Sequence, residues 1–513
     1  MQNGTRLAAI DIGSNSFRLE ISAVDHGQIQ RVEYIKDTVR LGNGLDATRN
    51  LTPEAMRRGW DALARFAERL ANFKHAQVRA VATQTLREAR NREEFLLRAR
   101  TTLGFGIDVI PGREEARLIY LGVAHLLPRN EQADGERRLV VDIGGRSTEL
   151  ALGRALEPQT MDSYRLGSVA WSMKYFPQGQ FSSATFRAAE VAAKAVLEEA
   201  LPIYPRDQWD VAYGASGTIG AVGDVLAAAG GTPGVITRTG LDDLIGRLIR
   251  AGSTDKVRIE GLREDRKPVI GGGVSVLRAL MDLLEIDQMQ VAQGALRHGL
   301  LHQLLDRDAG VTDLRETTVE RLSARFVTDP AQAARVAHTA QMLYLQLRDS
   351  AETQDTAERP QDAAGDGRRS LRKLRWAAVL HEAGVQISHT DYHKHGAYII
   401  DHCDAPGFTL DDMHQLSQLI LGHRGKLHKI EIMLNDADFV MQLLALRLAV
   451  LLCHARRDPQ PQALHLARRD ASTFEIQAHA DWAAHYPQSM HLLREEAFAW
   501  HRVGRKLRVL LVN

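Results

Sequence analysis

Three segments of the sequence share one plan, an apolar run followed by a turn of small residues. They are residues 7–16 (LAAIDIGSNS), 139–149 (LVVDIGGRSTE) and 211–218 (VAYGASGT). Small residues at a turn let backbone N–H groups approach an anion closely, and Ser and Thr hydroxyls add further donors. One such turn usually only reverses the chain. Three of them, two with an Asp at the strand end, predict a phosphate held between two related halves and closed off by the third turn.

The residues expected to bind phosphate are those of the three turns: Gly13, Ser14, Asn15, Ser16, Gly144, Gly145, Arg146, Ser147, Thr148, Gly214, Ser216, Gly217 and Thr218.

Three carboxylates lie beside the first two turns. Asp11 and Asp142 precede them, and Glu149 follows Asp142 by seven positions. Mg²⁺ takes a few carboxylates together with waters and phosphate oxygens, so a strand-end Asp can bind the ion or its waters. Each Asp can instead cap its own turn, and Glu149 can be a solvated strand residue. If the intervening turn is a hairpin, Asp142 and Glu149 face one cleft, and we expect both, with Asp11, to hold the metal.

Two adjacent acids, Glu114 and Glu115, open an expected helix. Such a pair usually only complements the helix dipole. The functional alternative is that one of them activates a water. Glu115 shares a helix face with Ile119 and Gly122 and therefore lies at an apolar boundary, where burial raises the pKa of a carboxyl toward a value useful in a base.

Arg87 lies just beyond an expected strand at residues 78–82. A guanidinium can hold a phosphate with two hydrogen bonds and stabilise charge on a transferring phosphoryl group. The alternative is an ordinary solvated helix residue.

Length and composition limit the class of protein. A chain of 513 residues is too long for one core, which favours three or four domains. Lys and Arg number 65 and Asp and Glu 64, and this balance does not suggest nucleic-acid binding. Cys403 and Cys453 can pair in principle but cannot form a disulfide framework or a thiolate metal site. With no visible signal peptide and no membrane span, we expect a soluble, cytoplasmic protein.

The periodicity of the chain changes twice, near residues 305 and 455. The first part is expected to have strands at 7–12, 17–24, 30–35, 78–82, 106–110, 139–143 and 149–152, with helices at 53–73, 114–127, 184–200 and 219–228. The middle part is expected to be helical, with a polar loop at 349–369. The last part is expected to have strands at 463–467 and 473–478, followed by a helix and a strand. The restart near residue 139 indicates an imperfect internal duplication.

Five segments together resemble the exopolyphosphatase and guanosine pentaphosphate phosphohydrolase family of the sugar kinase/heat-shock/actin superfamily. They are residues 11–16, 82–87 (ATQTLR), 111–120 (PGREEARLIY), 142–149 and 214–218. The resemblance covers most of residues 6–305 and continues more weakly to the end, as in the long bacterial exopolyphosphatases.

This resemblance implies an α/β fold of two actin-like (ribonuclease H-like) domains, a helical HD-like domain and a small C-terminal α+β domain. The expected domains are 1–125, 126–305, 306–455 and 456–513. The resemblance also implies Mg²⁺ as the cofactor, leaves open a monovalent cation such as K⁺, and suggests a homodimer.

The family motif assigns catalysis to the second Glu of its Glu-Glu-Ala-Arg segment, which is Glu115. The expected catalytic residues are Glu115, Arg87, Asp142 and Glu149. Arg146 departs from the family, which usually has Gly there. It either adds a phosphate contact or covers the mouth of the site.

The helical region resembles an HD-type metal phosphohydrolase domain through His338, His381, Glu382 and His423. Glu382 stands where the HD signature has Asp, and the late Asp expected near residues 448–450 is absent, so we do not expect a complete metal site. Basic residues of this region can instead form a track for long polyphosphate, although such charges are usually a solvated face. They are Arg372, Lys373, Arg375, Lys394, His395, Arg424 and Lys426.

The main functional hypothesis is an Mg-dependent exopolyphosphatase that releases terminal orthophosphate from inorganic polyphosphate. The alternatives are a guanosine pentaphosphate (pppGpp) 5′-phosphohydrolase, a non-catalytic polyphosphate or alarmone-binding protein, and a kinase of the same superfamily. Residues 271–273 (GGG) are a weak candidate for the nucleotide site that a kinase needs.

Overall fold

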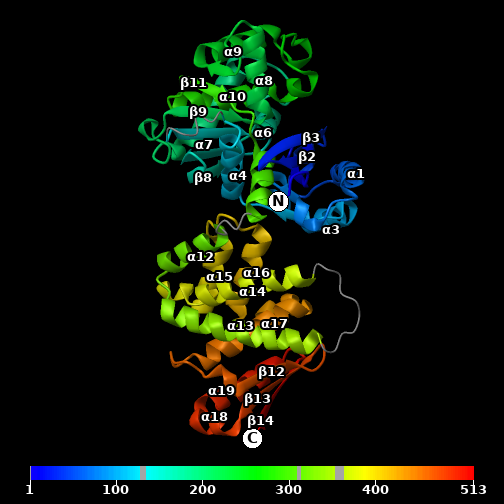
Figure 1. Ribbon diagram of the computed structural model, residues 1–513. Helices are drawn as coiled ribbons and strands as arrows, with labels where there is room; N and C mark the ends of the chain where they lie inside the picture. The colour runs from blue at the N-terminus through cyan, green and yellow to red at the C-terminus, as the bar shows by residue number, and fades with distance from the viewer. Residues whose placement is uncertain (1, 128–134, 309–313, 353–362, 513) are drawn as a thin grey trace. The chain divides into compact units, whose positions relative to one another are not determined.

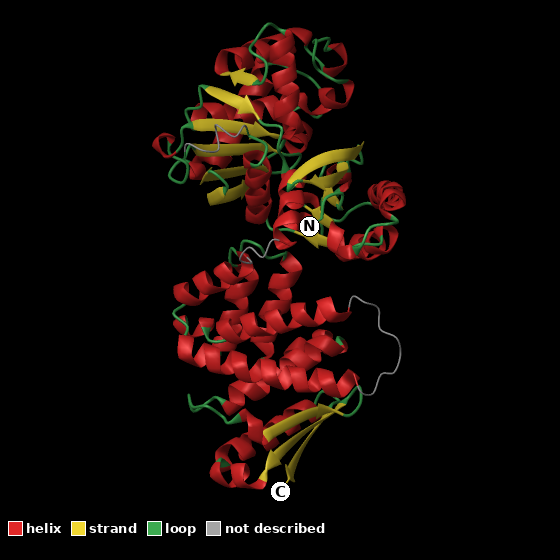
Figure 2. Cartoon of the chain, viewed as in Figure 1, coloured by secondary structure: helices red, strands yellow, loops and turns green. Residues whose placement is uncertain are grey.

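The computed structural model describes residues 2–127, 135–308, 314–352 and 363–512. The chain divides into two compact units, unit 1 (Met1–Val311) and unit 2 (Thr312–Asn513). Figures 1 and 2 show that unit 1 combines strands with helices, whereas unit 2 is mostly helical and carries one small sheet.

Unit 1 contains two sheets of related topology. The first has the order β3-β2-β1-β4-β5, from β1 (Arg6–Ile12), β2 (Phe17–Asp25), β3 (Gln28–Asp37), β4 (Val78–Ala82) and β5 (Ile107–Val109). The second has the order β10-β11-β9-β6-β7-β8, from β6 (Arg137–Ile143), β7 (Thr148–Arg154), β8 (Glu157–Tyr164), β9 (Val211–Ala215), β10 (Val235–Thr237) and β11 (Gln288–Val291). In each sheet the first three strands are antiparallel neighbours, and the next strand along the chain pairs in parallel with the first. The internal duplication is therefore confirmed.

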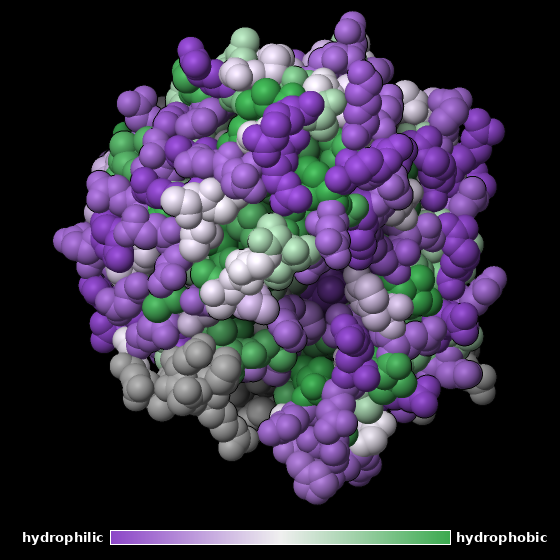
Figure 3. Space-filling model, turned by 90° about the horizontal axis from the view of Figure 1, so that it is seen from above, coloured by the Kyte–Doolittle hydropathy of each residue, from purple (hydrophilic) through white to green (hydrophobic). Residues whose placement is uncertain are grey.

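The helices of unit 1 that the structure describes connect and cover these strands. They are α1 (Pro53–Leu70), α2 (Gln84–Glu88), α3 (Arg92–Leu103), α4 (Gly112–Ala124), α6 (Ser168–Tyr175), α7 (Ser183–Leu197), α8 (Ser216–Ala228), α9 (Arg238–Ala251), α10 (Lys267–Leu283) and α11 (Leu296–Asp308). The face in Figure 3 carries mostly hydrophilic side chains, with small separate hydrophobic patches.

Helices α4 and α11 cross closely and join the two halves of unit 1. α11 packs on α4 and β1, while α4 also packs on β7 and β8 of the second sheet. A side chain at Gly122 would overlap the backbone of Ala295, and one at Gly299 would overlap the backbone of Leu118. Only glycine lets the two helix backbones approach this closely.

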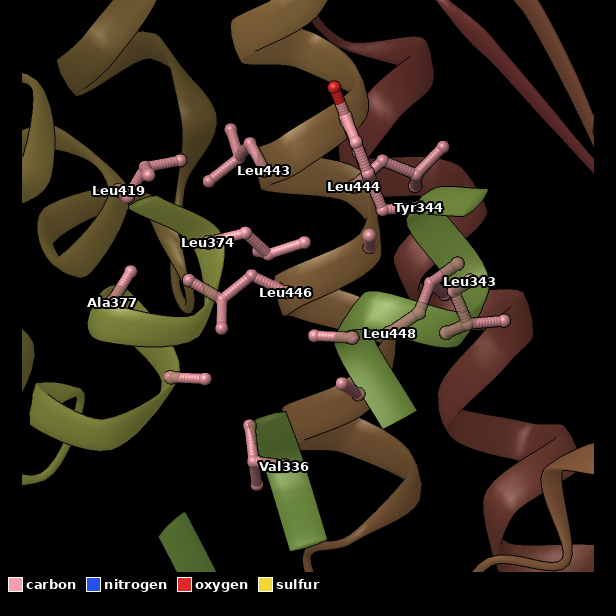
Figure 4. Packing of buried hydrophobic residues seen from close by; sticks show 14 of the residues in the cluster. Val336, Leu343, Tyr344, Leu374, Ala377, Leu419, Leu443, Leu444, Leu446 and Leu448 are labelled. Carbon is pink, nitrogen blue, oxygen red and sulfur yellow. The ribbon is translucent and has the colours of Figure 1, made fainter. Parts of the chain in front are cut away.

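Unit 2 has a helical core and a small sheet. Its helices are α12 (Leu314–Arg325), α13 (Pro330–Glu352), α14 (Ala363–Leu380), α15 (Tyr392–His402), α16 (Leu410–Gly422), α17 (Ala437–Leu452), α18 (Ala480–His485) and α19 (Pro487–His501). Figure 4 shows side chains of α13, α14, α16 and α17 packed together, among them Tyr344, Leu374 and Leu446. The sheet has the order β12-β13-β14, from β12 (Leu464–Arg468), β13 (Thr473–His479) and β14 (Lys506–Val512).

Most expected elements are present, with three kinds of difference. The helix expected at 53–73 ends at Leu70, and the helix expected at 114–127 covers Gly112–Ala124. The loop expected at 349–369 was predicted too long, because α13 continues to Glu352 and α14 begins at Ala363. The remaining residues of that range lie outside the described residues. The expected elements did not include β8, β9, β10 and β11, which are short or rich in polar residues. They also did not include helices such as α3, α9 and α10.

Within the described ranges, no helix has both the length and the apolar character needed to cross a bilayer. Cys403 and Cys453 are not paired with each other.

Candidate phosphate site in unit 1

The first and second phosphate turns lie side by side. The first follows β1 and the second follows β6, the equivalent strands of the two sheets. A Cβ added at Gly145 would lie 3.2 Å from Cβ of Ser14 and 3.6 Å from the backbone N of Asn15. The small residues of the two turns thus permit the close approach of the two loops, and their role in holding an anion stays a prediction.

Backbone hydrogen bonds shape both turns. Gly42 N–H donates to the carbonyl of Ser14 and Ser168 N–H to the carbonyl of Gly144, at 2.8 and 2.9 Å. Thr85 Oγ1 donates to Ser14 Oγ at 2.8 Å. The hydroxyl of Ser16 is buried without a protein partner, so it can bond to a bound ligand.

Two predicted phosphate-binding side chains of the second turn have protein partners. Arg146 donates to Glu88 at 3.0 and 3.2 Å and to the carbonyl of Gly42 at 3.2 Å. It therefore ties the second turn to the first half of unit 1. Thr148 Oγ1 donates to the carbonyl of Leu166 at 2.8 Å. The phosphate role of these two side chains stays a prediction.

The third turn joins β9 to α8 and contains a strained residue. Ser216 has a φ of +94°, a conformation that non-glycine residues rarely adopt. Its Oγ accepts N–H bonds from Thr218 at 3.2 Å and Ile219 at 3.4 Å. The guanidinium of Arg266 lies so close to Gly217 that no Cβ fits between them.

Asp142 and Glu149 are direct cross-strand neighbours in the β6–β7 pair, so the turn between them is a hairpin, as the prediction required. Both residues are buried. Burial and then the negative charge of Glu115 raise the pKa of Asp142 to about 7. Burial, Glu115 and Asp142 raise the pKa of Glu149 well above its usual value, although Ser163 Oγ donates to it at 2.8 Å. Ionising all of these carboxylates at once is unfavourable, because they have too few counter-charges nearby.

The structure distinguishes the two adjacent acids at the start of α4. Glu114 is held by its helix neighbour Arg117 through two hydrogen bonds of 2.7 Å. Glu115 accepts a 2.6 Å bond from Arg87, while burial raises its pKa against the opposing effect of that arginine. Glu115, and not Glu114, is thus the acid that interacts with Asp142 and Glu149.

Arg87 is fixed from several sides. Its guanidinium also donates to Gln84 at 2.7 and 2.9 Å and to the carbonyl of Ile110 at 3.0 Å. Arg87 therefore orients Glu115, and its contact with phosphate stays a prediction.

Three arginines beside the site were not singled out from the sequence. Arg18 donates to Asp11 at 2.8 Å, and Arg297 lies 3.8 Å from Asp11 and 3.2 Å from Glu20. Arg266 is buried, and its Nε forms no hydrogen bond although it lies 3.9 Å from Asp265. Burial and then Arg18 lower its pKa. Arg18 lies two residues beyond the first turn, a spacing that could have drawn attention to it. No local motif marks Arg266 or Arg297.

The carboxylates fit a hard divalent cation such as Mg²⁺. Buried carboxylates are normally paired with cations or coordinate metals. Of Glu115, Asp142 and Glu149, only Glu115 has a direct ion pair among the described residues, with Arg87, and the more distant Arg18 and Arg297 do not offset the raised pKa of Asp142. Within the described part of the chain, no three His, Cys, Asp or Glu side chains converge in a metal-binding group. The residues therefore fit an ion that one or two carboxylates hold, with waters and phosphate oxygens completing its coordination shell, as Mg²⁺ prefers. One oxygen of Asp11 is engaged by Arg18, and its metal role stays a prediction.

The histidines of unit 2 that resemble an HD site do not form one group. The rings of His381 and His423 are 5.5 Å apart, whereas His338 lies exposed on α13. Glu382 pairs with Arg456 at 2.8 Å.

Several members of the predicted basic track are engaged by neighbours. Arg375 pairs with Glu316, Lys373 donates to Gln415, and Lys394 pairs with Asp391 at 2.8 Å. Arg424 lies over the ring of Tyr392, and Lys426 is exposed.

The glycine run at 271–273 lies inside α10. A side chain at Gly272 would overlap Ser168 and Ser172 of α6, and one at Gly273 would overlap Thr218 of α8. These glycines therefore serve close helix packing, which accounts for the run without a nucleotide.

Comparison with known proteins identifies the family. Residues 20–308 match the model of the Ppx/GppA phosphatase family, and residues 314–497 match the model of Ppx/GppA phosphatase, domain III. A guanosine-5′-triphosphate,3′-diphosphate pyrophosphatase of Vibrio cholerae is 37% identical over 98% of this chain and 97% of its own length. One of Aeromonas hydrophila is 36% identical over 99% of this chain and 100% of its own.

A solved structure supports the same assignment. The Ppx/GppA family member of Aquifex aeolicus is 25% identical, with a TM-score of 0.50 over 59% of this chain and 98% of that one. The actin-like fold implied by the resemblance is thus confirmed. The chain belongs to the Ppx/GppA phosphatase family and is an enzyme that hydrolyses phosphoanhydride bonds.

Proposed function

We propose that the chain removes a terminal phosphoryl group by in-line attack of water, with Glu115 as the general base. The observation that carries this proposal is the environment of Glu115, which is buried, oriented by Arg87 and surrounded by the carboxylates of Asp142 and Glu149. A carboxylate whose pKa is raised can accept a proton from water near neutral pH. The water oxygen bonds to phosphorus, Glu115 takes the proton, and the P–O bond to the leaving phosphate breaks.

The phosphate turns supply the charge stabilisation that such a reaction needs. Phosphoryl transfer depends mainly on positioning and on electrostatic stabilisation of the equatorial oxygens. The adjacent turns around Ser14 and Gly145 present backbone N–H groups, and the start of α8 at Ser216 adds the positive end of a helix dipole.

Asp142 and Glu149 are the residues that would hold Mg²⁺. The ion would neutralise phosphate charge and fix the orientation of the transferred group. This role accounts for two buried carboxylates opposite each other in a hairpin, where the charge of Asp142 otherwise only raises the pKa of Glu149.

We propose guanosine pentaphosphate as the substrate, which the sequence alone placed as an alternative to polyphosphate. Relatives matching almost the whole chain at 36–37% identity are named for this compound. The compound carries two separate polyphosphate groups. The phosphate turns suit one of them, and the poorly compensated Arg266, next to Arg18 and the third turn, suits the other.

Inorganic polyphosphate is the second candidate, because it contains the same bond. Arg424 and Lys426 support it, since neither has a carboxylate partner among the described residues. The pairing of Arg375 and Lys394 leaves fewer free cations for a long polyanion than the sequence suggested.

One assay tests the reaction and the substrate together. Orthophosphate release is measured from guanosine pentaphosphate, long polyphosphate and tripolyphosphate, in parallel and without a nucleotide acceptor. We expect the highest kcat/KM on guanosine pentaphosphate. Faster turnover of polyphosphate would reverse the assignment, and release from none of the three would remove the hydrolase mechanism.

A variant of Arg266 tests the second anionic position. Arg266→Met removes a charged donor, so the KM for guanosine pentaphosphate should rise about 10- to 100-fold, whereas that for tripolyphosphate should change little. Arg263→Met is the matched control, because Arg263 is a neighbouring arginine with a more exposed side chain. Equal effects of Arg266→Met on both substrates would contradict this position.

A further inference from the structure

A continuous chain of hydrogen bonds leads from the second phosphate turn to Glu115. Arg146 of that turn donates to Glu88 Oε2 at 3.0 and 3.2 Å. Gln84 Nε2 donates to the other oxygen of Glu88 at 2.7 Å. Gln84 Oε1 accepts from Arg87 at 2.7 and 2.9 Å, and Arg87 donates to Glu115 at 2.6 Å. These five residues are called the relay below.

The amide of Gln84 has one possible direction in this arrangement. Gln84 is only 5% exposed, with its oxygen toward the guanidinium of Arg87 and its nitrogen toward the carboxylate of Glu88. A flipped amide would direct N–H groups at a cation and an oxygen at an anion, so both contacts would become repulsive. A buried polar network that is fully satisfied is rigid. Gln84 therefore transmits the position of Glu88 to Arg87.

Side-chain bonds hold Arg87 in place more than its own helix does. α2, which carries Gln84, Arg87 and Glu88, has 5 residues, and so short a helix has little stability of its own. The bonds of Arg87 to Gln84, Glu115 and the carbonyl of Ile110 engage four of its five N–H groups. The guanidinium therefore cannot turn away from Glu115 without breaking several bonds together.

Arg146 connects the relay to both phosphate turns. It belongs to the second turn, and its Nη1 donates to the carbonyl of Gly42 at 3.2 Å. The N–H of Gly42 donates to the carbonyl of Ser14 in the first turn at 2.8 Å. The side chains of Arg146 and Glu88 are 20% and 16% exposed, so water and salt screen this ion pair only partly. One guanidinium thus fixes the two turns and α2 relative to each other.

We propose that Arg146, Glu88 and Gln84 are positioning residues, which orient Glu115 through Arg87 and align it when the two phosphate turns are in contact. This inference rests on the proposed role of Glu115 as the base. The three residues act at a distance from the reacting water and from the carboxylates proposed to hold the metal. The role of Arg146 requires Glu88 and does not require a contact with phosphate.

An exchange of Gln84 and Glu88 tests the relay at constant net charge. Gln84→Glu places two carboxylates against each other, so kcat should fall about 10- to 100-fold. In Glu88→Gln the side chain can accept from Arg146 or from Gln84 but not from both, so kcat should fall about 3- to 10-fold. The double variant restores every bond, because the acid at position 84 accepts from Arg87 and from the amide at position 88, whose oxygen accepts from Arg146. It should be more active than either single variant.

The measurement is the initial rate of orthophosphate release from guanosine pentaphosphate and from tripolyphosphate. The relay acts on the base, so kcat should fall by the same factor on both substrates while KM changes little. The Mg²⁺ concentration for half-maximal activity should stay at the wild-type value in each variant, and circular dichroism should show the wild-type fold. A loss on one substrate only, or a shifted Mg²⁺ titration, would contradict the proposal.

A double-mutant cycle tests whether Arg146 acts through Glu88. Arg146→Met should lower kcat about 3- to 10-fold in the wild-type chain and have little further effect in the Glu88→Gln chain. The control is Arg79→Met, which should leave kcat unchanged. Arg79 pairs with Asp108 and has a side chain 16% exposed, but it lies near the start of β4, whereas α2 follows the end of that strand.

Three results would overturn the relay. The first is an exchange variant no more active than Gln84→Glu. The second is a cycle in which the losses from Arg146→Met and Glu88→Gln multiply, and the third is an effect of Arg146→Met on KM alone. Glu115→Gln separates this inference from the proposed function. If Glu115→Gln stays active, the assignment of the base fails and the relay fails with it, whereas an inactive Glu115→Gln with a failed exchange removes the relay alone.

Discussion

Buried charges are treated differently in the two units. In unit 1, Glu115 is paired with Arg87, and Arg18 and Arg297 act on Asp142, yet burial and mutual repulsion still raise the pKa values of Glu115, Asp142 and Glu149. In unit 2, Glu496 receives two bonds from Arg447 and one from Trp500, so its buried charge is well paired. Charges that support a fold are normally satisfied within it. A buried carboxylate without enough counter-charges, as in unit 1, marks a place where the protein is expected to bind a positively charged ligand.

The largest expected effect concerns the incompletely paired acids. Glu115→Gln removes the proposed base, so kcat should fall about 10²- to 10⁴-fold while substrate binding changes only a few-fold. Glu114→Gln is the matched control, because Arg117 already pairs with that acid. Single-turnover kinetics and a binding titration measure the two quantities. If Glu114→Gln were the inactive variant, the assignment within the pair would be wrong.

The buried ion pair of Arg447 and Glu496 in unit 2 predicts a loss of stability when one partner is removed. Arg447→Met leaves Glu496 buried without its partner, so unfolding of unit 2 should become about 3–5 kcal/mol easier in a urea titration. Arg456→Met removes a more exposed pair with Asp329 and Glu382 and should cost at most about 1 kcal/mol. Similar losses for both variants would show that burial does not distinguish these ion pairs.

The metal requirement sharpens the comparison within unit 1. Asp142→Asn and Glu149→Gln each remove a hard oxygen ligand, so the Mg²⁺ concentration for half-maximal activity should rise. The chain with Glu88→Gln is a control, because Glu88 pairs with Arg146 outside the carboxylate group. An unchanged Mg²⁺ titration in both carboxylate variants would place the ion elsewhere.

The pH dependence of stability is expected to be gradual, with a small effect per pH unit. The pKa of Asp142 is 3.8 in the unfolded chain and about 7 in the folded one. Between these values the folded chain keeps a proton that the unfolded chain has lost. The stability that this group contributes therefore falls as pH rises toward 7, by at most about 1.4 kcal/mol per pH unit, and is lost above it.

Asp412 in unit 2 is expected to behave in the opposite way. Its pKa is lowered because Arg369 and Lys373 outweigh burial, so its contribution is lost as pH falls. Urea unfolding of the wild type and of Asp142→Asn, in chelator and from about pH 5 to 8, should show a difference that shrinks toward low pH. A constant difference would argue that Asp142 is ionised throughout.

Local patterns in the sequence were sufficient for much of the fold. The apolar runs before the first two phosphate turns predicted β1 and β6 because strands buried on both faces lack polar alternation. The hairpin joining Asp142 to Glu149 was a condition of the expected cleft, and the β6–β7 pairing meets that condition. The choice of Glu115 over Glu114 rested on the helix face and the family motif, and the bond from Arg87 agrees with it.

What the sequence did not reveal depends on contacts between distant segments. Arg266 reaches the third turn and Arg297 reaches Asp11 from parts of the chain that carry no motif. The partners of Arg146 and Arg375 are equally remote, at Glu88 and Glu316. The sequence alone does not show the ion-pair partner of a basic residue. It therefore cannot distinguish a free cation from one that a carboxylate neutralises.

The glycine crossing of α4 and α11 has a consequence for how substitutions will be tolerated. Gly122, Gly294 and Gly299 touch no proposed ligand, yet any larger residue there would push apart the helix that carries Glu115 and the helix that carries Arg297. A saturation screen scored on activity should therefore find these three positions as intolerant as Glu115, the proposed base. The position of the proposed base thus depends on a helix contact that has no room even for a methyl group.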